Sequence, residues 1–120
     1  MHYKELVNKL NRETAIVIFF KRDGSIRTML CTRNISTGML SNGEIFHVKG
    51  NESKNNELNG NITVVDLEKN EFRAFNIYRV VYIEYLGLID TQEKLERAKE
   101  LCEHIRQRYN SSAEVRFNAL

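Results

Sequence analysis

The chain has 120 residues, of which 42% are apolar and 28% are charged, and 18 Lys and Arg against 16 Asp and Glu give a formal net charge of +2. A chain of this length and composition can bury a hydrophobic core, which excludes a disordered chain, a collagen-like repeat and a disulfide scaffold. Because there is no proline, a rigid proline-rich linker is also excluded. We expect one domain over residues 1–120.

The first third of the chain predicts a helix and a hairpin. Apolar residues recur at helical spacing from residue 3 to residue 10 and predict a helix of about ten residues: Tyr3, Leu6, Val7 and Leu10. Thr14 to Lys21 and Ile26 to Arg33 are rich in β-branched and aromatic residues. Asp23-Gly24 lies between them and is the strongest hairpin signal in the sequence.

Residues 34–60 are polar and contain four of the six glycines. This composition predicts a loop over most of the stretch. A short strand is predicted at Ile45 to Lys49. We expect disorder at residues 50–58, where asparagine and charged residues dominate.

A second hairpin follows this loop. Asn61 to Leu67 and Phe72 to Ile77 have the composition of strands, and residues 68–71 form the turn between them. Another strand is predicted from Val80 to Leu86, where Gly87 ends it. Five short strands within residues 14–86 predict a small, strongly bent antiparallel barrel or sandwich.

The last third changes to helical periodicity. Asp90 and Glu93 have the spacing of a capping box. The apolar stripe that follows predicts an amphipathic helix over about residues 90–110: Leu95, Ala98, Leu101, Cys102, Ile105 and Tyr109. We expect a short final strand at Ala113 to Phe117.

The sequence offers little for catalysis. None of its three histidines has a partner at metal-ligand spacing, and no nucleophile or phosphate-loop motif occurs. Cys31 and Cys102 lie far apart in the sequence, and we expect both to be small buried apolar side chains. We therefore expect no enzymatic activity, no metal and no cofactor.

Location and charge limit the classes of partner. The longest apolar run, Ala15 to Phe20, is far shorter than the roughly 20 residues that cross a bilayer, and the polar N-terminus is unlike a secretory signal. We expect a cytoplasmic protein without membrane contact. A pI near 8.6 argues against tight nonspecific DNA binding. Folding can still gather a local basic patch: Lys21, Arg22, Arg27 and Arg33.

Arginines lie within the apolar faces of two predicted strands. Alternation places Arg73 on one face with Phe75 and Ile77, and Arg27 on one face with Arg33. Such an arginine either lies at a barrel rim with its guanidinium in solvent or closes a pocket for an anionic or planar ligand. Aromatic rings and arginines together are suited to single-stranded nucleic acid or a nucleotide.

Two segments resemble the motifs of a known family. Residues 17–34, VIFFKRDGSIRTMLCTRN, and residues 64–80, VVDLEKNEFRAFNIYRV, look like the leading and closing motifs of small, mostly bacteriophage-encoded Sm-like or SH3-like β-barrels related to the WYL domain. The resemblance covers about residues 15–86. WYL domains are ligand- or nucleic-acid-sensing modules of bacterial regulators, and the resemblance matches their ligand arginines to Arg73 and Arg79. The sequence departs from the family in having Phe72 at the usual tryptophan position and in showing no helix-turn-helix.

We therefore predict an α+β fold: a small five-stranded antiparallel SH3/Sm-like β-barrel with an N-terminal helix and a long C-terminal helix. The expected function is that of a non-enzymatic phage accessory protein in the host cytoplasm, which binds nucleic acid or a nucleotide-like ligand. The predicted binding residues are Arg27, Arg33, Arg73, Arg79, Tyr78 and Tyr82. The alternative is a protein-interaction module that inhibits or redirects a host protein through the 90–110 helix or an open barrel edge.

Overall fold

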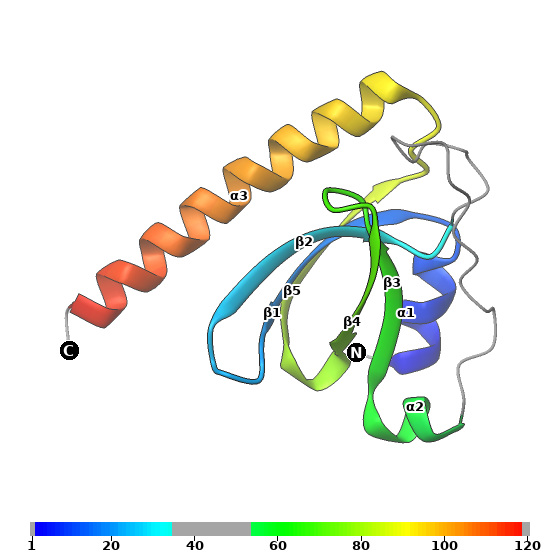
Figure 1. The fold of residues 1–120 in the computed structure, drawn as a ribbon, viewed down its shortest axis with the longest axis horizontal. Coiled ribbons are helices and arrows are strands. Elements are labelled where there is room, and N and C mark those ends of the chain that lie inside the picture. The colour runs from blue at the N-terminus through cyan, green and yellow to red at the C-terminus, as the bar shows by residue number, and fades with distance from the viewer. Residues whose placement is uncertain (1, 35–53, 119–120) are drawn as a thin grey trace.

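The computed structural model describes the backbone of residues 2–34 and 54–118 and the side chains of residues 2–34 and 56–109 (Figure 1). In chain order the elements are α1 (Tyr3–Leu10), β1 (Thr14–Phe20), β2 (Ile26–Thr32), α2 (Lys54–Asn59), β3 (Asn61–Asp66), β4 (Glu71–Asn76), the 3-10 helix η1 (Ile77–Arg79), β5 (Val80–Gly87) and α3 (Gln92–Asn118). The strand predicted at residues 45–49 lies outside the described residues.

The five strands form one antiparallel sheet in the order β4-β3-β2-β1-β5. The sheet bends round on itself, with α1 beside β3 and α3 running across the outside of the sheet (Figure 1). This arrangement confirms the predicted α+β fold with a helix at each end. None of the helices in the described residues has the length and apolar character that a bilayer crossing requires.

The inner face of the sheet carries the larger core. Alternate residues of β1, such as Ala15, Val17 and Phe19, point into it together with the buried face of α1. The hydroxyl of Tyr3 donates a hydrogen bond to the carbonyl oxygen of Asn61 at 2.7 Å and thereby fixes α1 against β3. The predicted helical stripe is confirmed, because both of its leucines are fully buried.

The outer face of the sheet is covered by α3. Ile16, Leu30 and Val65 lie on this face and pack with Leu95 and Cys102 of the helix. The predicted amphipathic stripe is thus confirmed for Leu95, Ala98 and Cys102, with Ile105 partly buried beside them, whereas Leu101 of the predicted stripe is 37% exposed. Both apolar faces of the sheet are therefore partnered, the inner one by α1 and the outer one by α3.

The first hairpin has the predicted turn. Gly24 has a φ of +86°, a conformation that glycine adopts without the steric cost of a side chain. Asp23 Oδ1 accepts hydrogen bonds from the amide and the hydroxyl of Ser25. These two hydrogen bonds lower the pKa of the Asp23 carboxyl below its ordinary value.

Three expectations about local structure were wrong. Residues 54–58 were predicted to be disordered but belong to α2. The helix ends just before Gly60, which has a φ of +80°. The predicted strand at residues 113–117 is part of α3, which continues to Asn118. Instead of a capping box from Asp90, the hydroxyl of Thr91 accepts the amide of Lys94 at 3.2 Å, and the Asp90 carboxylate forms an ion pair with the Lys94 side chain.

The second and third strands pair over a very short length. β2 pairs with β3 only at Cys31↔Asp66 and Thr32↔Val65, and the amide of Leu67, just after β3, donates to the Leu30 carbonyl oxygen at 2.9 Å. Because the two strands are antiparallel, the first half of β2 extends past the end of β3 and lies opposite the turn that joins β3 to β4. The barrel is therefore open between the first hairpin and the second, and the described hollows with the most basic linings lie at this opening.

Candidate functional site

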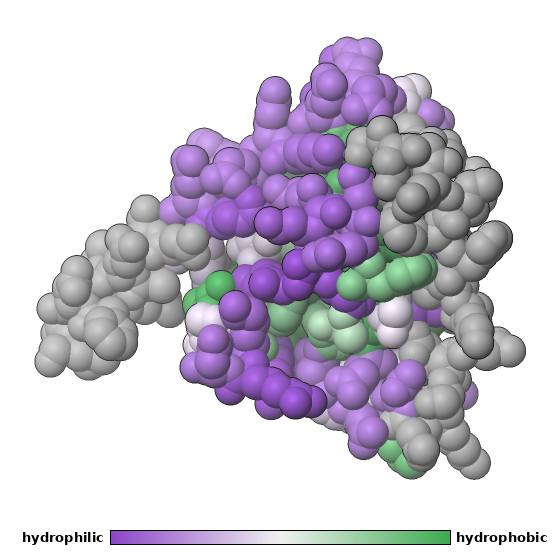
Figure 2. Space-filling view, viewed as in Figure 1, coloured by the Kyte–Doolittle hydropathy of each residue, from purple (hydrophilic) through white to green (hydrophobic). Residues whose placement is uncertain are grey.

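A cleft lies between the tip of the first hairpin, α2 and the β3–β4 hairpin, and we call it the basic cleft. It has a volume of about 640 Å³. It is lined by Phe19, Phe20, Lys21, Arg22, Arg27, Asn56, Asn59, Asn61, Thr63, Ala74, Phe75, Asn76 and Arg79. On the face shown in Figure 2, apolar side chains are visible between hydrophilic ones, over the strands that Figure 1 shows in the same view.

Two aromatic rings form the floor of the basic cleft. Phe19 of β1 and Phe75 of β4 are both buried, and their ring centroids lie 5.6 Å apart in a stacked arrangement. This contact joins strands that are not neighbours in the sheet and so holds the two hairpins together. Phe20, the next residue of β1, also lines the cleft and is 43% exposed.

The rim of the basic cleft is positively charged. Lys21, Arg22, Arg27 and Arg79 line it, and none of its described lining residues is acidic. Within the described part of the chain, none of these four side chains makes an ion pair. Because the positive charge is not neutralised within the cleft, its electrostatic potential is positive and attracts an anion.

Asparagines form the wall of the basic cleft opposite the first hairpin. The Asn76 amide nitrogen donates to the carbonyl oxygen of Asn59 at 2.7 Å and to Asn61 Oδ1 at 3.1 Å. Asn76 Oδ1 accepts the amide of Tyr78 at 2.9 Å and caps η1. These hydrogen bonds fix the position of η1 and therefore the starting point of the Arg79 side chain.

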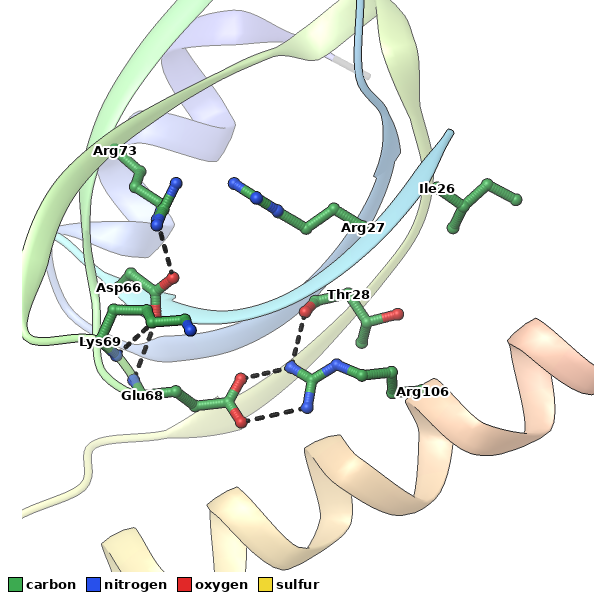
Figure 3. A pocket seen from close by; sticks show the side chains of 8 residues that line it. All are labelled: Ile26, Arg27, Thr28, Asp66, Glu68, Lys69, Arg73 and Arg106. Carbon is green, nitrogen blue, oxygen red and sulfur yellow. Dashed lines mark hydrogen bonds and ion pairs between the residues drawn. The ribbon is translucent and has the colours of Figure 1, made fainter. Parts of the chain in front are cut away.

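A second hollow adjoins the basic cleft at Arg27, and we call it the end hollow. It has a volume of about 480 Å³ and is lined by Ile26, Arg27, Thr28, Asp66, Glu68, Lys69, Arg73 and Arg106. Arg27 and Arg73 extend into it from β2 and β4 and point toward each other (Figure 3). The end hollow exists because β2 extends beyond β3, so that its strand edge faces a turn.

Acidic side chains hold two of the basic groups of the end hollow. Arg73 Nε lies 3.2 Å from Asp66 Oδ2, close enough for an ion pair but not aligned for a hydrogen bond, and Arg73 also forms an ion pair with Glu71. Asp66 is kept in place by the turn, because its Oδ1 accepts the amides of Glu68 and Lys69. The acidic residues therefore orient Arg73 rather than leave it free.

Arg106 closes the end hollow from the side of α3. Its guanidinium donates to both oxygens of Glu68 and, at 2.8 Å, to the carbonyl oxygen of Thr28. The hydrogen bonds from Arg106 to Glu68 and Glu103 raise the pKa of the guanidinium above its ordinary value, although burial opposes them. The Thr28 carbonyl belongs to the part of β2 that has no strand neighbour on this side, so α3 supplies the missing donor.

The structure brings together three of the six predicted binding residues. Arg27 lines both hollows, Arg73 lines the end hollow, and Arg79 lines the basic cleft. Arg33 does not join them, because it is 5% exposed and its Nε donates to Asn11 Oδ1 at 2.9 Å. Its guanidinium also donates to the carbonyl oxygen of Thr63, so Arg33 connects the end of α1 to β3.

The two predicted tyrosines lie outside both hollows. Tyr78 is 76% exposed and its ring lies beside Gly60. Tyr82 lies on β5 and lines a separate groove of about 500 Å³ between β5 and α3, with Leu101 and Ile105. The sequence prediction missed Phe20 and the asparagines of the cleft wall, and the only signal for them was the proximity of Phe20 to Asp23-Gly24.

Both cysteines lie in the interior of the described structure. Cys31 and Cys102 are free and buried, as predicted. Burial raises the pKa of both thiols, that of Cys102 to about 12. Among the described residues, no three His, Cys, Asp or Glu side chains lie close enough together to hold a metal ion.

Comparison with known proteins gives one match. A protein-family model described as WYL_2, Sm-like SH3 beta-barrel fold matches residues 3–81. The match includes the basic cleft and most of the end hollow but not α3, which supplies Arg106. Neither the curated proteins nor the solved structures include a significant match to the chain.

Proposed function

Because the chain belongs to the WYL_2 family of Sm-like SH3 β-barrels, we propose that its barrel binds nucleic acid or a nucleotide-like ligand in the basic cleft. The observation that carries this proposal is the lining of the cleft, where four basic side chains and exposed aromatic surface meet without an acidic residue. Guanidinium and ammonium groups bind phosphate oxygens, and Phe20 stacks on a base. The role is binding rather than catalysis.

The proposed biological setting is that of a bacteriophage accessory protein that acts within the host cell. This part of the proposal depends on the resemblance of residues 17–34 and 64–80 to mostly phage-encoded domains. A small barrel that binds a nucleic acid or a nucleotide through one cleft would act there as a regulator or a sensor. The identity of the ligand decides between these two roles.

The test is a binding titration with single-stranded and double-stranded DNA and RNA, measured by fluorescence anisotropy at low salt. We expect Arg79→Gln to weaken binding by about three- to tenfold and to reduce the salt dependence of binding by about one phosphate contact. Arg97→Gln is the matched control, because Arg97 is exposed on α3 and lines neither hollow. Absence of binding above background for every nucleic acid would refute the nucleic-acid form of the proposal.

Stacking is tested by a second pair of variants. Phe20 and Phe72 are both 43% exposed, but only Phe20 lines the basic cleft. Replacing a stacking ring costs about 1–3 kcal/mol per base, so Phe20→Leu should weaken binding by at least about fivefold. Phe72→Leu should leave binding unchanged. Equal effects of the two variants would show that the cleft does not stack bases.

A second candidate function is a protein-interaction module that acts on a host protein. The observation that favours it is the groove between β5 and α3, where Tyr82 is 46% and Leu101 is 37% exposed. Affinity purification with nuclease treatment separates the two functions. A stoichiometric protein partner that survives nuclease and is lost with Leu101→Asp supports the second, whereas loss of all partners after nuclease supports the first.

A further inference from the structure

The end hollow has a wall on the side of α3. Arg106 and Glu68 lie between the hollow and α3 and are joined to each other, and Arg106 is joined to the backbone of β2 at Thr28 (Figure 3). A polymer that runs through the basic cleft and past Arg27 therefore meets this wall. The hollow is suited to the end of a ligand rather than to its middle.

Two basic side chains of the end hollow have no acidic partner. Within the described residues, neither Arg27 nor Lys69 makes an ion pair, whereas Arg73 and Arg106 are each held by acidic neighbours. The eight lining residues include four basic and two acidic side chains, and Glu71 and Glu103 pair with Arg73 and Arg106 from outside the lining. Arg27 and Lys69 are therefore the two lining cations that no carboxylate of the described residues pairs.

The geometry of the two arginines indicates what belongs between them. The guanidinium groups of Arg27 and Arg73 point toward each other across the hollow (Figure 3). The two like charges repel each other, and an anion placed between them is attracted by both guanidinium groups. The guanidinium of Arg27, which makes no ion pair among the described residues, can donate two parallel hydrogen bonds to a tetrahedral oxyanion such as a phosphate, and Arg73 faces the same oxyanion while Asp66 and Glu71 hold it.

We propose that the end hollow binds a phosphomonoester, namely the terminal phosphate of the nucleic acid or nucleotide that occupies the basic cleft. This inference rests on the proposed function and specifies the end of its ligand. A phosphomonoester carries a charge of about −1.5 to −2 at pH 7, which suits the two unpaired cations Arg27 and Lys69 better than the single charge of an internal phosphodiester does. Lys69 and Arg27 neutralise the terminal phosphate, and Arg73 orients it.

The test compares short single-stranded oligonucleotides of one sequence that carry a 5′-phosphate, a 3′-phosphate or hydroxyls at both ends. Each competes with an internally labelled oligonucleotide for the protein. We expect one of the two phosphorylated ends to bind about tenfold or more tightly than the hydroxyl-ended strand. Lys69→Gln should abolish this advantage and leave the affinity for the hydroxyl-ended strand within about twofold. Lys94→Gln, an exposed change on α3, should keep it.

The outcomes separate the two proposals. Equal affinity for all three strands overturns the terminal-phosphate site and leaves the proposed function standing. If no strand binds, the nucleic-acid form of the proposed function fails, and a titration with phenyl phosphate followed by NMR decides on the site alone. Shifts at the amides of Arg27 and Lys69 that disappear in Lys69→Gln support the site. Absence of such shifts at millimolar phenyl phosphate overturns it.

Discussion

Replacing Arg106 by methionine tests whether α3 is fastened to the barrel through the end hollow. Methionine keeps an unbranched apolar stem but removes every donor. The variant breaks the two hydrogen bonds to Glu68 and the one to the Thr28 carbonyl. Since the side chains of Arg106 and Glu68 are only 28% and 23% exposed, water restores these contacts incompletely.

We expect Arg106→Met to lower the free energy of unfolding by about 2.5 kcal/mol. Charge-assisted hydrogen bonds contribute about 1.5–3 kcal/mol, and partial exposure places the Glu68 pair at about 1.5 kcal/mol. A buried carbonyl that loses its donor adds about 1 kcal/mol. Urea unfolding at neutral pH measures the change.

The matched control is Arg97→Met on the same helix. Arg97 and its partner Glu93 are each 73% exposed, and an exposed pair of this kind contributes less than about 0.5 kcal/mol. The difference between the two variants therefore isolates the contacts of Arg106 with the barrel. If Arg106→Met costs no more than Arg97→Met, α3 is not held by this contact and the reasoning is refuted.

Three further outcomes follow from local geometry. Gly60→Ala should cost more stability in urea unfolding than Gly24→Ala, because both positions have positive φ but a Cβ at Gly60 would lie 2.7 Å from the Tyr78 ring; equal costs would contradict this. With its pKa raised to about 12 by burial, Cys102 is only about one part in ten thousand thiolate at pH 8 and should resist iodoacetamide until the protein is unfolded. Asp66→Ala should destabilise the protein by about 1 kcal/mol more than Asp66→Asn, whose amide oxygen still accepts the two turn amides; urea unfolding of both variants checks this.

The helices and strands were predictable where the spacing of apolar side chains and the residues of the adjoining turn indicate the same local structure. The stripe of α1, the Asp23-Gly24 turn and the alternation of the strands each specify one local structure, and the family resemblance adds the barrel. α2 was missed because its six residues contain a single apolar side chain, Leu58, which is 72% exposed. The backbone of residues 113–117 remains helical in a segment that contains neither proline nor glycine to end the helix.

The site was only partly predictable, because the sequence specifies strand faces but not positions along the barrel. Alternation places Arg27 of β2 and Arg33, the residue that follows β2, on one face, and nothing local distinguishes them. The amide of Arg33 donates to the Leu10 carbonyl at 2.9 Å, which buries Arg33 at the end closed by α1, whereas Arg27 lies at the open end. That difference arises from a contact between residues far apart in the sequence, which alternation alone does not reveal.

The short pairing of β2 with β3 links the site to the C-terminal helix. Had β3 continued alongside β2, its backbone would have satisfied the Thr28 carbonyl, and the space of the end hollow would have been filled by a strand. Because β3 ends at Asp66, the same edge needs a donor from elsewhere, and Arg106 of α3 provides it. The residue that closes the end hollow therefore lies outside the segment matched by the family model. It follows that the shape of the end hollow depends on α3 being docked, so ligand binding at the terminal-phosphate site and docking of the helix should stabilise each other.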